Sequence, residues 1–212
     1  METDRLIRTL AADGAPRGMS MSRMWSLTAL AAAAIAAAVF FMSIGPRGDI
    51  ADAAHTIRFL FKFVVTLALF ATAFAALRGL AIPGVNPARA MAPLVLAPAL
   101  LLIAVGLELL AIPPSQIESR WIGSNALICM TFIPMIGIGP LAAFLFALRN
   151  GAPTRPSLAG AVSGLVAGGL SATFYAAHCT DDSPLFVATF YPLAIAMLVV
   201  AGAVAGRFVA RW

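Results

Sequence analysis

The sequence predicts an all-α integral membrane protein, a bundle of six transmembrane helices with both termini in the cytoplasm. Hydrophobic residues make up 61% of the 212 positions and charged residues only 11%, against about 25% charged residues in a soluble domain. A water-soluble fold could not hide that much apolar surface, so most of the chain must lie in lipid. The apolar residues also form six runs, each near the about 20 residues that cross the hydrocarbon layer.

These six runs follow residues 1–23, which are the only sizeable soluble segment of the chain. We place the runs at Met24–Ile44, Phe59–Leu80, Met91–Ile112, Asn125–Leu148, Ser157–Ala177 and Leu185–Arg207. The first run is too long for the apolar core of a signal peptide, so we expect it to be retained as an anchor. The connections are short, which predicts antiparallel neighbours in one compact transmembrane domain, residues 24–212.

The basic residues predict the orientation of the bundle. If the N-terminus is cytoplasmic, that side carries ten of the 14 basic residues. The ten are Arg5, Arg8, Arg17, Arg23, Arg78, Arg89, Arg149, Arg155, Arg207 and Arg211, and the outer four are Arg47, Arg58, Lys62 and Arg120. Cytoplasmic loops carry an excess of Lys and Arg, so this distribution favours both termini inside. No basic patch with aromatic residues is present, which argues against nucleic acid as a direct partner.

The cytoplasmic segment 1–23 contains one amphipathic stretch. Thr3 is expected to cap a short helix that runs through Ala12, and Gly14 and Pro16 are expected to end it. The residues that could contact a partner are the apolar Leu6, Ile7 and Leu10, together with Arg5 and Arg8. Ten residues form only a marginal helix in water, so this helix is expected to order against a partner or the membrane.

Glycines repeat every four residues in the last two runs. Gly160, Gly164 and Gly168 do so in the fifth run, and Gly202 and Gly206 in the sixth. Small residues on one stripe let helix backbones approach closely in lipid, where no hydrophobic effect drives helix association. We therefore expect the fifth and sixth helices to pack together through these glycines.

The runs contain little that a membrane enzyme or transporter needs. No histidine lies inside a run, and two isolated cysteines fall short of the close pair of a disulfide-forming oxidoreductase. The sequence therefore predicts no enzyme. Lys62 and Glu108 lie about one turn from the outer surface, where snorkelling explains them as well as a functional role does. A small metal or solute transporter stays open as the alternative function, because 212 residues could form half of an oligomeric carrier.

The polar loop between the fifth and sixth runs concentrates the reactive side chains. Residues 175–186 (YAAHCTDDSPLF) hold one of two histidines, one of two cysteines and two adjacent carboxylates. The other cysteine, Cys129, is expected about 6 Å inside the outer surface at 1.5 Å per residue. It would therefore share one layer with Cys179. The two could form a disulfide, or each could be a small buried hydrophobic residue.

The same loop supports two further interpretations, which are compatible with each other. Thiolate, imidazole and carboxylate groups together can bind a soft or borderline metal ion. The possible metal ligands are Cys129, Cys179, His178 and Asp181, with His55 or Glu118 as additional candidates. No C-x-x-C spacing supports such a site. In the second interpretation, Asp181 or Ser183 caps the sixth helix and Pro184 occupies its first turn.

Four stretches of the chain together carry a family resemblance. They are LIRTLAAD at 6–13 with Pro16, RNGAPTRP at 149–156 followed by LAG at 158–160, AHCTDDSP at 177–184, and the closing Gly206-Arg207 with Arg211-Trp212. In this order they resemble the NrsF family of membrane anti-sigma factors. The resemblance covers nearly the whole chain, although residues 44–123 match only in hydropathy.

The resemblance implies a function. It implies that the chain holds an extracytoplasmic-function sigma factor at the bacterial inner membrane and releases it under heavy-metal or oxidative stress. It also implies that Cys129 and Cys179 sense the signal and that the sigma-binding surface is cytoplasmic. We therefore expect the face of Leu6, Ile7 and Leu10 to dock on the sigma factor. The sigma factor and the lipid bilayer are the expected partners, and no cofactor is expected beyond a transient heavy-metal ion as the signal.

Overall fold

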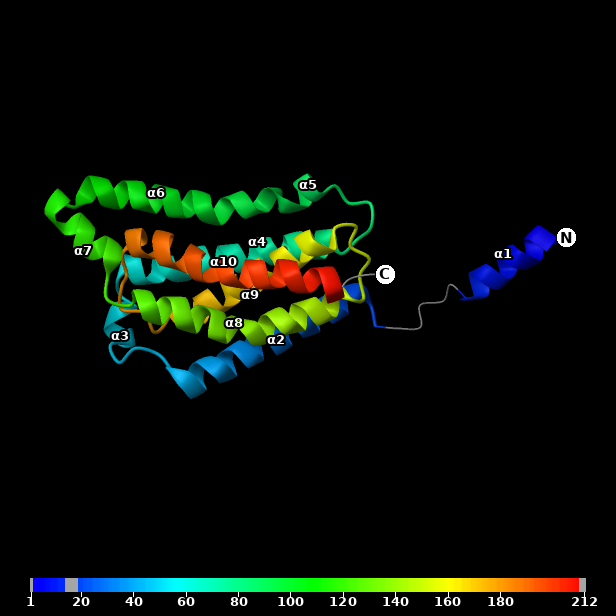
Figure 1. The fold of residues 1–212 in the computed structure, drawn as a ribbon, viewed down its shortest axis with the longest axis horizontal. Helices are drawn as coiled ribbons and strands as arrows, with labels where there is room; N and C mark the ends of the chain where they lie inside the picture. Colours follow the sequence, from blue (N-terminus) through cyan, green and yellow to red (C-terminus); the bar gives the residue numbers. More distant parts are fainter. Residues whose placement is uncertain (1, 14–18, 210–212) are drawn as a thin grey trace.

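The computed structural model describes residues 2–13 and 19–209, with side chains for 3–9 and 19–209, and this part is entirely helical between its loops (Figure 1). The helices of the six membrane-length segments are α2 (Met21–Ser43), α4 (Ile57–Leu80), α6 (Leu96–Ala111), α8 (Ala126–Leu148), α9 (Pro156–Ala176) and α10 (Pro184–Val209). Six segments of the described chain are long and apolar enough to cross a membrane. The predicted six-helix organisation is therefore confirmed, and most span limits agree within three residues.

The third span departs from the prediction of one helix from Met91. It begins as the short α-helix α5 (Pro87–Met91), continues as a 3-10 turn (Ala92–Val95) and returns to α-helix in α6. Pro93 lies in the 3-10 turn, and proline cannot donate the backbone hydrogen bond that a regular α-helix requires.

Short helices and the N-terminal helix complete the described chain. They are α1 (Glu2–Asp13), α3 (Ile50–Ala53), a second 3-10 turn (Pro114–Gln116) and α7 (Ile117–Ile122). The expected N-terminal helix is present, but it begins at Glu2, so the cap predicted at Thr3 is wrong. The side chain of Leu10 and residues Gly14, Pro16, Arg17, Arg211 and Trp212 lie outside the part that the structure describes.

Helix α9 forms the centre of the bundle. Most of its side chains are buried, and it packs against α10, α4 and α8. Its contact with α10 brings backbone against backbone, because a Cβ atom built on Gly160 would overlap the carbonyl oxygen of Gly202. A Cβ atom on Gly164 would meet the carbonyl oxygen of Leu198 in the same way. The predicted packing through glycines is confirmed.

The two ends of the bundle differ in what they carry (Figure 1). The terminal end holds the start of α2, which follows the N-terminal segment, and the end of α10. The cysteine end holds α3, α7, the start of α8 and the loop between α9 and α10. With an even number of antiparallel spans, the first span starts and the last span ends at the same end of the bundle. Anything sensed at the cysteine end must therefore be transmitted along the helices to affect the terminal segments.

Candidate functional site

Both cysteines lie inside one apolar cluster at the cysteine end. Cys129 is the fourth residue of α8, and Cys179 follows the end of α9. Each is 0% exposed, and both pack in a cluster that includes Tyr175, Phe186 and Tyr191. The predicted common layer is confirmed. The two thiols are unpaired in this structure, and a reagent can reach them only if the loop above them opens.

Three charged residues from separate parts of the chain lie over Cys179. The Lys62 ammonium donates to the Cys179 carbonyl oxygen at 2.7 Å and pairs with Asp182 at 2.5 Å. Arg47 Nη1 donates to the same carbonyl oxygen at 3.3 Å and pairs with Asp182 at 3.0 Å. We call these residues the Arg47–Lys62–Asp182 cluster. It joins the loop after α2, helix α4 and the loop after α9.

Lys62 is held in this cluster and does not reach the surface. Its residue exposure is 0%, so of the two explanations that the sequence left open for Lys62, snorkelling is excluded. A buried ammonium needs a charge partner and hydrogen bonds to offset its lost hydration, and Asp182 and the Cys179 carbonyl oxygen supply them. The Phe59 ring lies 5.2 Å from the ammonium and 5.8 Å from the Arg47 guanidinium, within range for cation–π attraction.

Arg47 also makes a two-point contact with an exposed carboxylate. Its Nε lies 2.6 Å from Asp49 Oδ1, and its Nη2 lies 2.7 Å from Oδ2. The hydrogen bond to Arg47 lowers the pKa of Asp49, and the same bond raises the pKa of Arg47 above its usual range. The backbone N–H of Arg47 donates to Ala177 at 3.0 Å. The loop after α2 is therefore fixed to the end of α9 by side chain and backbone together.

Asp181 caps the start of α8, the helix that carries Cys129. Its Oδ2 accepts hydrogen bonds from the backbone N–H groups of Ser124 at 2.9 Å and Asn125 at 2.8 Å, and from Asn125 Nδ2 at 3.0 Å. The prediction that Asp181 caps the sixth helix is wrong. Ser183 has that role, because its Oγ accepts from the Leu185 N–H at 3.2 Å. Pro184 begins α10, as predicted.

A second buried carboxylate, Glu108, ties α6 to the same end. It accepts a hydrogen bond from Ser183 Oγ at 2.7 Å and pairs with Arg120 at 3.3 Å and Arg58 at 3.6 Å. Its side chain is only 2% exposed, so snorkelling is excluded for Glu108 as well. Four parts of the chain therefore meet at Glu108: α4, α6, α7 and the start of α10.

The four residues suggested as metal ligands do not converge. Among the described residues, no three of the His, Cys, Asp and Glu side chains lie in a position to hold one ion. His178 Nδ1 is hydrogen-bonded to the Gly45 carbonyl oxygen at 2.9 Å, and Asp181 is engaged in capping α8. The additional candidates His55 and Glu118 are exposed. The chemistry available at the cysteine end is that of two buried thiols.

Burial sets the reactivity of these thiols. It raises the pKa of the Cys179 thiol, and the positive charge of Lys62 opposes that shift only in part. The thiolate is the form that attacks oxidants and binds metal ions. In the closed structure Cys179 is therefore both covered and protonated at neutral pH.

The partner-binding residues expected on α1 are available for contact where their side chains are described. Leu6 is 58% and Ile7 57% exposed, and Arg5 and Arg8 are also exposed. Large apolar side chains exposed side by side on an amphipathic helix are typical of a surface that a partner covers.

Sequence reasoning missed Arg47, Lys62 and Asp182 as one group. Lys62 is the only lysine of the chain and lies inside an apolar run, which is a signal in itself because buried charges require partners. The sequence did not reveal which loops supply those partners.

Comparison with known proteins gives the family of the chain. A family model described as "Negative regulator of sigma F" (NrsF) matches residues 10–212. The "Anti-sigma-F factor NrsF" of Caulobacter vibrioides (strain NA1000 / CB15N) is 32% identical over 215 residues, covering 100% of both chains. The "Probable anti-sigma-F factor NrsF" of Azospira oryzae (strain ATCC BAA-33 / DSM 13638 / PS) is 32% identical over 216 residues, again covering 100% of both. No solved structure matches the chain. The chain therefore belongs to the NrsF family of negative regulators of sigma F.

Proposed function

We propose that this chain is an anti-sigma factor of the bacterial inner membrane. It holds an extracytoplasmic-function sigma factor on its cytoplasmic side and releases it when Cys129 and Cys179 react with a heavy metal or an oxidant on the outer side. Full-length similarity to anti-sigma-F factors supports the regulatory role. The observation that carries the sensing role is the burial of both cysteines in one cluster at the end of the bundle remote from the terminal segments.

The proposed signal acts on two thiols that the closed bundle covers. An oxidant that takes two electrons and two protons from the thiols joins them as a disulfide. A soft metal ion instead displaces both thiol protons and binds the two thiolates. Either product changes the position of Cys179, whose carbonyl oxygen is held by Lys62 and Arg47. The signal thereby disturbs the Arg47–Lys62–Asp182 cluster.

Helices α4 and α9 offer a route to the cytoplasmic side. Lys62 lies on α4, Cys179 follows α9, and these two helices pack against each other. The close backbone contact of α9 with α10 makes this part of the bundle stiff, so a shift at one end favours a shift at the other. A coupling free energy of about 1–3 kcal/mol would change the affinity for the sigma factor about 5–150-fold.

The sensing role is tested with a Cys129→Ser/Cys179→Ser double variant in cells that carry a sigma-dependent reporter. The variant is expected to insert in the membrane and to repress the reporter, but to stop responding to cadmium or peroxide. The matched control is Ser163→Cys on a wild-type background, which adds a buried thiol in the middle of α9 and should leave the response unchanged. A double variant that still induces the reporter normally would refute thiol sensing.

The docking role is tested separately on α1. Leu6→Asp/Ile7→Asp places two charges in the apolar face and is expected to abolish co-purification of the full-length chain with a sigma factor. Thr9→Asp adds a charge to the same helix without removing an apolar side chain and is the matched control. If the first variant still bound the sigma factor, the docking surface would have to lie on other cytoplasmic segments. If the purified wild-type chain carried no sigma factor and instead moved metal ions into vesicles, it would be a transporter.

A further inference from the structure

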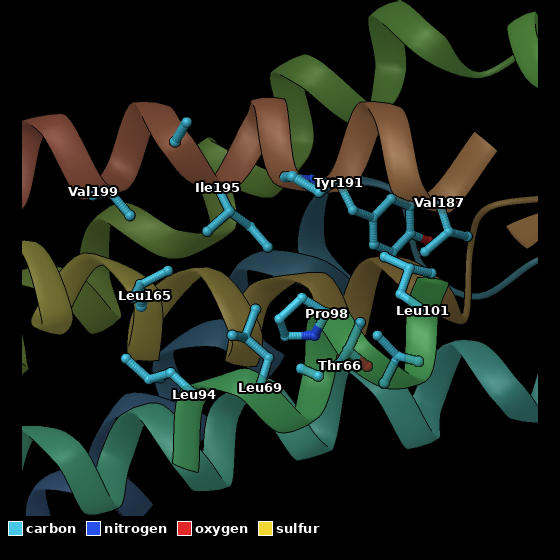
Figure 2. A pocket seen from close by; sticks show the side chains of 14 residues that line it. Thr66, Leu69, Leu94, Pro98, Leu101, Leu165, Val187, Tyr191, Ile195 and Val199 are labelled. Atoms are coloured by element: carbon cyan, nitrogen blue, oxygen red, sulfur yellow. The ribbon is translucent and has the colours of Figure 1, made fainter. Parts of the chain in front are cut away.

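An elongated apolar cavity lies between α4, α6, α9 and α10 (Figure 2). Its volume is about 350 Å³, within the range of ligand-binding pockets. Pro98 and Leu101 line it from α6, Leu94 lines it from the 3-10 turn before α6, and Tyr191 and Ile195 line it from α10. Val65, Thr66 and Leu69 form its wall on α4, and Leu165 contributes from α9.

The cavity follows the direction of the helices. Along α10 its lining runs from Val187 to Val199, a rise of about 18 Å at 1.5 Å per residue. Val187 and Leu101 lie toward one end of the cavity, and Val199 and Leu94 lie toward the other (Figure 2). The space therefore runs parallel to the expected membrane normal. The residues at both of its ends belong to the membrane-length segments.

The cavity exists because α6 is held mainly at its two ends. Glu108 ties the end of α6 to α4, α7 and α10. At the other end of this span, Ala90 in α5 lies close against Gly79 of α4. Between these two attachments, α6 contacts α4 and α10 much less extensively than α9 does. Pro98 and Pro192 face this gap, and neither has a backbone N–H group that could serve a polar ligand.

The chemistry of the lining selects the occupant. Thr66 and Tyr191 carry the only hydroxyl groups among the lining side chains, and Thr66 Oγ1 is already used by the Lys62 carbonyl oxygen at 2.8 Å. A lining with so few free polar groups offers a water molecule too few hydrogen-bond partners. The cavity is partly open to the outside of the bundle, where Pro98, Pro192 and Ala196 are exposed. In a membrane-spanning chain this opening faces the hydrocarbon tails, so the cavity is continuous with the lipid-facing surface.

We propose that the cavity is a binding site for one acyl chain of a membrane phospholipid, seated lengthwise between α6 and α10. The acyl chain fills space that would otherwise reduce packing contacts on every side. It also packs against Tyr191, which belongs to the buried cluster of Cys129 and Cys179. The lipid therefore supports one wall of the cysteine cluster, and this site is separate from the thiols themselves.

The site is tested by photo-cross-linking of the full-length chain. The chain is reconstituted in vesicles of phosphatidylethanolamine and phosphatidylglycerol that contain a phosphatidylethanolamine with a diazirine in its acyl chain. After illumination, mass spectrometry is expected to find adducts on Leu94, Leu101 and Val199 in excess over the outward-facing Leu102 and Leu110. Equal labelling of the two sets would mean annular lipid only and would overturn the proposal.

Filling the cavity provides the matched comparison. Ala196→Phe places a ring in the opening and is expected to remove the adducts within the cavity while leaving those on Leu102 and Leu110. Val200→Phe adds the same ring on an exposed position of α10 outside the cavity and should leave all adducts in place. Leu101→Phe narrows the cavity from α6 and is a second variant if the first does not insert.

Two other occupants give distinct results. Cross-links from the cavity residues to a second copy of the chain would identify a dimer contact and refute the lipid site. If a diazirine fatty acid labelled the cavity residues and the phospholipid did not, the phospholipid would be refuted as the occupant. None of these readouts uses the cysteines or a sigma factor, so the test stands whatever the outcome for the proposed function.

Discussion

The Lys62 ammonium donates a 2.7 Å hydrogen bond to the carbonyl oxygen of Cys179, across 117 positions of the chain. This bond places the only lysine of the protein directly on the backbone of one of its two cysteines. The same ammonium pairs with Asp182, so the loop that carries Cys179 is held to α4 at two points. Opening this loop requires the separation of a buried ion pair, and its closed state keeps both thiols covered.

Replacement of Lys62 by Met is expected to loosen the loop. Removal of one partner of a buried ion pair costs about 3–5 kcal/mol, and we expect the lower end because Arg47 still pairs with Asp182. The measurements are the midpoint of thermal unfolding in detergent and the rate of maleimide labelling of Cys179. The midpoint should fall and the labelling rate should rise.

The control for this variant is Arg58→Gln, which removes one charged partner of Glu108. The side chain of Arg58 is 46% exposed. Glu108 keeps its contacts with Arg120 and Ser183 in this variant, so Arg58→Gln should change neither measurement much. An unchanged labelling rate in Lys62→Met, with the protein folded, would show that the charged cluster does not cover Cys179.

Asp181→Ala is expected to destabilise the start of α8. Loss of an N-terminal cap costs about 0.5–2 kcal/mol, and Asp181 satisfies the backbone N–H groups of Ser124 and Asn125, which directly precede α8. Hydrogen exchange at Ser124 and Asn125 should accelerate, while exchange in the middle of α8 should stay slow. Thr180→Ala is a suitable comparison, because it removes one side-chain hydrogen bond to Asn125 and leaves the cap in place. Equal exchange in both variants would contradict the assigned cap.

The spans and their glycine packing could be predicted because they depend on local patterns. Apolar length marks α2, α4, α8, α9 and α10 within a few residues, and the four-residue spacing of Gly160, Gly164 and Gly168 marks the face of α9 that meets α10. In lipid, hydropathy is the dominant constraint on where a helix can lie. A single sequence is sufficient for such features.

The polar contacts could not be predicted because they join distant segments. Asp181 and Asp182 are neighbours, yet Asp181 turns to the start of α8 and Asp182 to Lys62 and Arg47. The choice depends on which helix ends surround the loop, which is tertiary information. For the same reason the sequence could not decide between snorkelling and a functional role for Lys62 and Glu108, since depth alone does not reveal a partner on another helix.

The raised pKa of Cys179 predicts how stability and reactivity depend on pH. Above about pH 8.5 the unfolded thiol ionises, while the folded Cys179 stays protonated because burial raises its pKa. The folded state then binds more protons than the unfolded state, so stability must fall as pH rises in this range. The unfolding midpoint of the wild-type chain should therefore decline more steeply above this pH than that of Cys129→Ser/Cys179→Ser.

Alkylation of Cys179 should still be accelerating above about pH 9, where an ordinary thiol is already largely ionised. A rate that levels off at the ordinary thiol pKa would mean that Cys179 is solvated.

Two glycine-to-alanine changes should have opposite effects on stability, although both lie within transmembrane helices. At Gly160 a Cβ atom overlaps the carbonyl oxygen of Gly202, so Gly160→Ala must push α9 and α10 apart. At Gly106 in α6 nothing lies within 4 Å of the added atom, and alanine is favoured over glycine in a helix by about 1 kcal/mol. We expect Gly160→Ala to lower the unfolding midpoint and to weaken the response of a sigma-dependent reporter, because α9 links the cysteine end to the terminal end. Gly106→Ala should raise the midpoint slightly and leave the response intact. A Gly160→Ala protein with wild-type stability would contradict the close backbone contact on which the proposed transmission depends.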